Sequence, residues 1–71
     1  SYQEKFSRRG NPYTTFRLED NGFSVTVFVW GHLGLKDGLR VRVSGVFQRV
    51  KQVGRYKFYN EISANKVQLL K

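Results

Sequence analysis

The stretch YTTFRLEDNGFSVTVFVW, residues 13–30, contains two runs of strand-forming residues joined by Asn21-Gly22. Asn-Gly is the strongest short-range signal for a two-residue type I′ turn, because both central residues of that turn must adopt a positive φ. The turn fixes which residues of the two strands lie opposite each other. A slip of one residue would exchange the two faces of the hairpin, so the register is strongly specified.

This register gives the hairpin two faces of different chemistry. One face is apolar and largely β-branched, as a core requires, and pairs Thr14 with Val29, Phe16 with Val27 and Leu18 with Val25. The opposite face, called the outer face below, pairs Tyr13 with Trp30, Thr15 with Phe28 and Arg17 with Thr26. Three aromatic rings and an arginine that face away from the core indicate a binding surface.

The composition is that of one small and strongly basic domain. The 71 residues include 13 Lys or Arg and 5 Asp or Glu, which gives a net charge of +8 and an isoelectric point of about 10.3. This value exceeds the threshold of about 9 that is typical of nucleic-acid-binding domains. Seven of the 13 cationic residues are arginines, whose planar guanidinium suits phosphates and stacks on bases. We therefore favour a polyanionic partner over a basic surface that only maintains solubility.

Several classes of function are disfavoured. The chain has no Cys and one His, His32, so a metal site lacks its usual ligands, and the sequence contains no nucleophile elbow or phosphate-binding loop. The acids Glu19 and Asp20 are neighbours on a turn, without the burial that acid–base catalysis needs. We expect no enzymatic activity, no cofactor and no metal. No apolar run approaches the roughly 18 residues of a membrane span, and we expect an intracellular location, in the cytoplasm, nucleoid or nucleus.

Glycine positions divide the chain into strands. We expect strands at residues 2–8, 13–19, 23–30, 39–50 and 55–62, and allow for a short final one at 66–70. Gly45 predicts a bulge or bend in the fourth strand, Gly54 predicts the turn of a second hairpin, and Phe58 is expected in the core. The glycine-rich residues 31–38 have no room for a substantial helix. These features predict a small closed or nearly closed barrel, with two packed open sheets as the alternative.

Four segments, in this order and spacing, resemble the OB-fold nucleic-acid-binding family. They are FRLED at 16–20, VTVFVWG at 25–31, LKDG at 35–38 and VRVSG at 41–45. This family includes synthetase anticodon-binding domains, the N-termini of exonuclease VII large subunits and replication-protein-A-like domains. The resemblance implies an all-β, five-stranded Greek-key barrel of OB type that binds single strands across the outer face of strands two and three.

The sequence departs from the family in two places. The first strand begins late, and the helix often found between strands three and four is absent. Because the chain also contains no Met, even at position 1, we expect residues 1–71 to be a single OB-fold domain of a longer protein, whose other domains are further candidate partners.

The predicted site combines the outer face with two basic loops. In OB domains the loop after the first strand and the hairpin between strands four and five flank the binding groove. The nucleic-acid-binding residues predicted on this basis are Arg8, Arg9, Tyr13, Thr15, Arg17, Thr26, Phe28, Trp30, Arg49, Lys51, Arg55, Lys57 and Tyr59.

These residues predict a non-catalytic domain that binds single-stranded DNA or RNA through base stacking and phosphate contacts. One alternative is a protein-interaction module whose aromatic face receives a peptide or a partner subunit. An oligosaccharide-binding site is the third alternative, since aromatic and hydroxyl groups also suit sugars. Nucleic acid predicts a steep salt dependence of binding and a sugar site almost none, whereas a protein partner would need a matching acidic patch.

Overall fold

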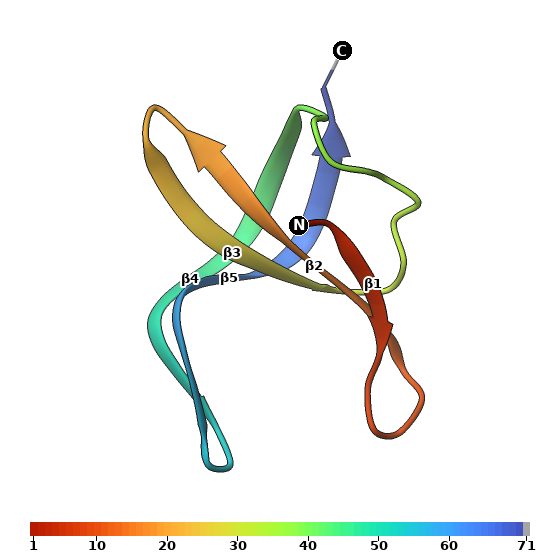
Figure 1. The fold of residues 1–71 in the computed structure, drawn as a ribbon, viewed down its shortest axis with the longest axis vertical. Coiled ribbons are helices and arrows are strands. Elements are labelled where there is room, and N and C mark those ends of the chain that lie inside the picture. Colours follow the sequence, from red (N-terminus) through yellow and green to blue (C-terminus); the bar gives the residue numbers. More distant parts are fainter. Residues whose placement is uncertain (71) are drawn as a thin grey trace.

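The computed structural model describes residues 1–70, which form one five-stranded sheet and no helix (Figure 1). The strands are β1 (Gln3–Phe6), β2 (Pro12–Asp20), β3 (Phe23–Trp30), β4 (Val41–Val53) and β5 (Tyr56–Leu69). Their order in the sheet is β1-β2-β3-β5-β4, with β3 parallel to β5 and the other neighbours antiparallel. The predicted all-β class is therefore confirmed.

The β2–β3 hairpin has the predicted turn and register. Asn21 and Gly22 have φ values of 49° and 78°, as a type I′ turn requires. Tyr13 lies opposite Trp30 and Phe16 opposite Val27. The apolar face is buried as expected, with Val27 fully enclosed at 0% exposure. The predicted inward and outward faces are therefore both present.

One polar side chain lies within this apolar face. Thr14 is fully buried, and its hydroxyl donates a hydrogen bond of 2.6 Å to the carbonyl oxygen of Gly31. The bond removes the cost of burying an unpaired hydroxyl. It also ties the start of the β3–β4 loop to β2, which holds Trp30 at the end of its strand.

Gly45 lies at a register shift in the long β4–β5 hairpin. Ser44 pairs with Lys66 and Gly45 with Ala64, so the predicted irregularity is present, with Asn65 of β5 as its extra residue. Pairing with β4 resumes on both sides of this shift, so β5 runs from Tyr56 to Leu69 and the separate final strand is wrong. Figure 1 shows the hairpin turning away from the sheet toward a tip at the lower left.

The part of the hairpin beyond the sheet carries exposed apolar side chains. β3 pairs with β5 only at residues 61–64, so the hairpin from residue 60 to the tip diverges from β3, and most of its side chains are exposed. Phe58 is 45% exposed, which makes its expected core position wrong. Tyr56 and Tyr59 are more exposed still, at 66% and 63%.

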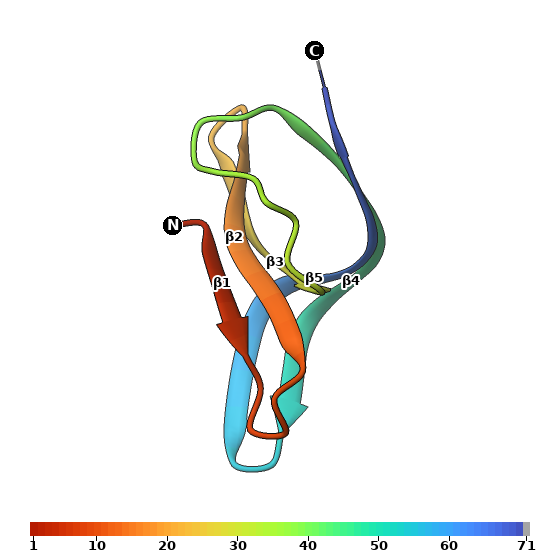
Figure 2. The same ribbon diagram turned by 90° about the vertical axis from the view of Figure 1, so that its right-hand side faces the viewer.

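The sheet is not closed into the predicted barrel. Its free edges belong to β1 and β4, which do not pair with each other, and Figure 2 shows them apart. β1 is shorter than predicted and pairs only with residues 12–15 of β2. Beside the rest of β2 lies an open groove of about 540 Å³, which includes Phe16 and Leu18 in its lining. The short first strand thus leaves one end of the core uncovered.

The close packing at Gly45 predicts a large effect of a single methyl group. A Cβ there would overlap the carbonyl oxygen of Ser63 and lie 2.7 Å from the Cα of Ala64, and both are backbone atoms. Gly45→Ala should lower the free energy of unfolding by about 1–3 kcal/mol, as overpacking does. Ser44→Ala, at an exposed neighbouring position, should change it by less than about 0.5 kcal/mol. Urea unfolding measures both, and equal stability of the two variants would contradict the bulge geometry.

Candidate nucleic-acid interface

Three aromatic rings of the outer face contact one another and form what we call the aromatic cluster. Tyr13 stacks on Phe28 with ring centroids 5.3 Å apart, and Trp30 meets Phe28 edge to face at 5.0 Å. Tyr13 and Trp30 are 6.1 Å apart. Cross-strand pairing of β2 and β3 brings the rings together, because directly opposed side chains lie within contact distance. Trp30 is 60% exposed, whereas Tyr13 and Phe28 are half-buried, so Trp30 offers the most accessible ring.

Lys51 of β4 extends over this cluster. Its ammonium nitrogen lies 4.7 Å from the centroid of the Phe28 ring and 3.1 Å from Oε1 of Glu61. The attraction of the ring face for a cation and the ion pair together hold the side chain in place. A base can therefore stack on Phe28 only where Lys51 moves aside, while Trp30 is free of this cover.

Glu61 is the one buried carboxylate of the described residues, with 5% of its surface exposed. Parallel pairing of β3 with β5 places it beside Thr26, on the same side of the sheet as Phe28. Lys51 and Glu61 are not opposite each other in the hairpin, since Lys51 pairs with Phe58 and Glu61 with Gln48. The strand alignment alone would not have identified this ion pair.

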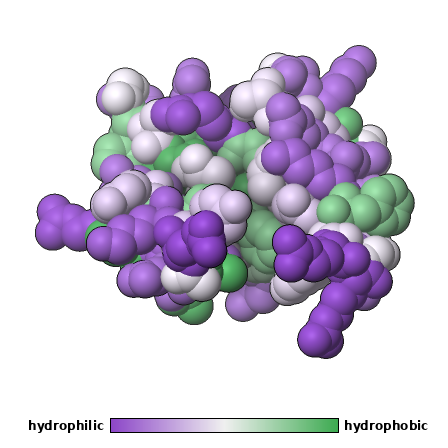
Figure 3. All heavy atoms as spheres, turned by 60° about the horizontal axis from the view of Figure 1, so that its bottom comes forward, coloured by the Kyte–Doolittle hydropathy of each residue, from purple (hydrophilic) through white to green (hydrophobic). Residues whose placement is uncertain are grey.

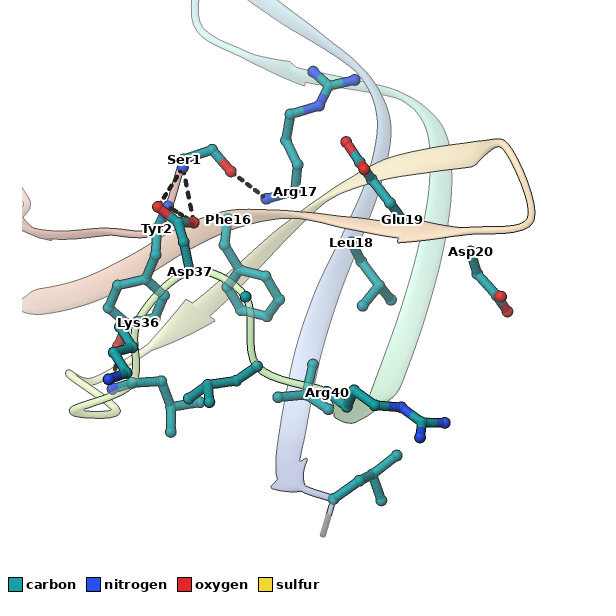
Figure 4. A pocket seen from close by; sticks show the side chains of 15 residues that line it. Ser1, Tyr2, Phe16, Arg17, Leu18, Glu19, Asp20, Lys36, Asp37 and Arg40 are labelled. Carbon is teal, nitrogen blue, oxygen red and sulfur yellow. Dashed lines mark hydrogen bonds and ion pairs between the residues drawn. The ribbon is translucent and has the colours of Figure 1, made fainter.

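Arg17 lies at the other end of the outer face. Its guanidinium donates hydrogen bonds to the Ser24 hydroxyl from Nε and Nη2, at 3.2 and 2.9 Å. It forms no ion pair within residues 1–70, although Glu19 is the acid nearest in sequence on its face. Figure 4 shows the guanidinium pointing away from the groove that Phe16 and Leu18 enter. Its positive charge is therefore held in place but not neutralised.

The tips of the β1–β2 loop and the β4–β5 hairpin lie at the lower end of the molecule in Figure 1, and residues of both line a second groove. This loop groove of about 570 Å³ is lined by Arg8 on one side and by residues 53–56 of the β4–β5 hairpin on the other. The β1–β2 loop is fixed by bonds between Ser7 and Asn11, including a backbone bond of 2.8 Å. Viewed from this end in Figure 3, hydrophilic side chains gather to the left and right of an apolar strip.

The positive charge of the two loops is not compensated by nearby acids. Among residues 1–70, Lys51 is the only Lys or Arg in an ion pair with a carboxylate. Glu4 and Asp37 are engaged by the N-terminal segment. A hydrogen bond from the Tyr2 hydroxyl lowers the pKa of Glu4, and one from the N-terminal ammonium lowers the pKa of Asp37. The loop arginines thus remain available to an external anion.

The structure brings together some of the predicted site residues and separates others. Tyr13, Phe28, Trp30 and Lys51 are in contact, and Thr15, Arg17 and Thr26 share their face. Arg8 and Arg55 line the loop groove. The remaining four predicted residues are exposed: Arg9, Arg49, Lys57 and Tyr59. Within residues 1–70, no hydrogen bond, ion pair or ring contact links any of them to the aromatic cluster. Glu61 and Ser24 also lie on this face but were not predicted from the sequence.

No cluster of His, Asp or Glu capable of holding a metal ion is found in the described part of the chain. Within the same residues, no helix is long and apolar enough to cross a membrane. Comparison with known proteins finds no matching family model, no matching curated protein and no matching solved structure.

The exposure of Trp30 predicts that its loss affects binding more than folding. Trp30→Ala should lower the affinity for a single-stranded oligonucleotide by about 1–3 kcal/mol, the value of one stacked base. The free energy of unfolding should fall by no more than about 1 kcal/mol, since only edge contacts with the two neighbouring rings are lost.

Val27→Ala is the matched control, because Val27 is enclosed on the opposite face. It should destabilise the fold by about 1–3 kcal/mol and leave the affinity of the folded protein nearly unchanged. Thermal melts and oligonucleotide titrations of both variants give the comparison. A large loss of stability with intact binding in Trp30→Ala would show that the outer face is not the site.

Proposed function

We propose that this domain binds single-stranded nucleic acid and does not itself catalyse a reaction. The observation that carries the proposal is the aromatic cluster with its exposed Trp30 ring, on a chain whose two loops carry arginines without ion-pair partners among residues 1–70. Aromatic rings stack on unpaired bases, because every base offers a π face, and arginines neutralise phosphates. A single strand crossing the outer face would use both kinds of contact at once.

We further propose that the open sheet is an OB-type fold. Supporting this is the strand order, because pairing the free edges of β1 and β4 would close the five strands into a small barrel. OB-folds bind through the face of strands two and three and through the loops between strands one and two and strands four and five. The aromatic cluster and the loop groove occupy these positions in this chain.

A protein-interaction module is the second candidate, and one observation favours it. The β4–β5 hairpin exposes Val50, Val53 and Tyr56 at 52%, 51% and 66%. Large exposed apolar groups near one another are typical of protein interfaces. A protein partner would need an acidic surface to match the net charge of +8, and its binding would survive Trp30→Ala if it used only the hairpin.

Single strands should bind more tightly than duplex of the same sequence. Bases within a duplex are stacked on each other and do not present a free face to Trp30, so the duplex can gain only phosphate contacts. We expect a preference of roughly tenfold or more, the equivalent of one stacked base. Fluorescence anisotropy with one labelled strand, alone and annealed, measures it at a single salt concentration. Equal affinities would contradict the stacking mechanism.

Binding should also depend steeply on salt. For roughly four to six neutralised phosphates, the slope of log K against log salt should be about −3 to −4. Replacing both Arg8 and Arg55 with Ala should reduce the magnitude of this slope by about 1.4, since each lost phosphate contact removes about 0.7.

The matched control removes the same charge elsewhere. Arg40 directly precedes β4 and Arg42 lies near its first residue, at the end of the strand opposite the loop groove. The double variant Arg40→Ala, Arg42→Ala should keep the slope of the parent protein to within about 0.5. Equal reductions in the two double variants would indicate a diffuse charge effect without a defined groove, and a parent slope near zero would contradict binding through phosphate contacts.

A further inference from the structure

The ion pair between Lys51 and Glu61 lies in the proposed binding face but has no role in stacking or phosphate contact. Glu61 is 5% exposed, and its Oε1 accepts a hydrogen bond of 3.1 Å from Lys51. A buried ion pair contributes little net stability, because the cost of removing both charges from water offsets their attraction. A carboxylate is also unfavourable on a surface that attracts a polyanion. Its position therefore suggests a function in recognition.

The second oxygen of Glu61 is available to a ligand. The only side-chain hydrogen bond of Glu61 within residues 1–70 is the one from Lys51 to Oε1. No fully enclosed polar side-chain atom in this part of the chain lacks a hydrogen-bond partner. Oε2 must therefore retain contact with solvent. The pair presents a hydrogen-bond acceptor next to an ammonium donor, beside the ring of Phe28.

We propose that Glu61 and Lys51 form a base-recognition site that selects guanine among unpaired bases. This inference rests on the proposed function of the outer face. The Watson–Crick edge of guanine carries two adjacent donors, N1–H and N2–H, next to the acceptor O6. One donor matches Oε2 of Glu61, the other matches Oε1, which can accept a second hydrogen bond beside the one from Lys51, and O6 matches the ammonium of Lys51. Charge-assisted paired hydrogen bonds of this kind are among the strongest in proteins.

The other bases fit this pair less well. Adenine and cytosine each offer one amino donor beside a ring nitrogen whose lone pair would face the carboxylate. Thymine and uracil offer one N–H between two carbonyl oxygens, both of which the carboxylate repels. Each of these bases would leave an acceptor of Glu61 opposite another acceptor, at a site too enclosed for water to separate them freely. The discrimination comes from this mismatch as well as from the guanine contacts.

The test measures the affinity of oligothymidylates of about 12 nucleotides, a length suited to one small domain. Central thymines are replaced by guanine, adenine, cytosine or inosine. Guanine should raise the affinity about tenfold over the other bases, the usual value of a paired base contact. Inosine, which lacks only the N2 amino group, should lose about fivefold relative to guanine.

Two variants assign the preference to the carboxylate. Glu61→Gln keeps the size of the side chain but replaces one acceptor oxygen by a donor, so guanine and inosine should bind equally. Glu19→Gln makes the same change at an exposed position, and the ratio of guanine to inosine affinity should remain that of the parent protein.

The outcomes separate the two proposals. Absence of binding to every oligonucleotide would overturn the proposed function and this inference with it. Binding without a guanine preference in the unmodified protein would overturn the inference alone. A preference for guanine over inosine that persists in Glu61→Gln would also overturn it, because a group other than Glu61 would then recognise the base.

Discussion

The register of the β2–β3 hairpin is the constraint on which both the core and the proposed binding face depend. Because side chains alternate along a strand, one register places Val27 in the core and Phe28 on the outer face. The two-residue turn at Asn21-Gly22 fixes which residues of the two strands lie opposite each other, so the register cannot slip by one residue. The hydrophobic burial that stabilises the hairpin thus also positions the aromatic rings, so the binding face is a consequence of folding.

In the proposed function, the sheet contacts bases and the loops contact phosphates. The rigid sheet face presents rings for bases, and the loop groove presents arginines for phosphates. The β4–β5 hairpin connects the two, because its tip lines the loop groove and its Lys51 lies over Phe28. The core is small and partly uncovered, so the close packing of Gly45 against β5 matters for stability.

Local signals of the sequence predicted the elements better than their assembly. Asn21-Gly22 and Gly54 adopt the positive φ of tight turns, and Gly45 leaves room for the backbone of β5, so the two hairpins and the register shift could be predicted. Closure of the sheet could not, because it depends on how far β1 extends beside β4, and the alternation at residues 2–8 is weak. Phe58 was misassigned because hydrophobicity does not reveal that the hairpin tip extends beyond β3.

In the candidate site, too, local contacts could be predicted from the sequence and contacts between distant segments could not. Cross-strand pairing predicted the contacts among Tyr13, Phe28 and Trp30, which lie on one hairpin. The ion pair of Lys51 with Glu61 joins residues that the hairpin alignment does not oppose, and the burial of Glu61 requires β3 beside β5. A parallel pairing between distant segments has no local signature, so this part of the site became visible only in three dimensions.

The fluorescence of Trp30, the single tryptophan of the chain, tests the central claim most directly. The indole emission is followed during titration with a single-stranded oligonucleotide, while a label on the strand reports binding independently. If bases stack on the outer face, the emission should be strongly quenched and the quenching should saturate together with the binding signal. Full binding with unchanged tryptophan emission would contradict the account, because the strand would then lie elsewhere on the molecule.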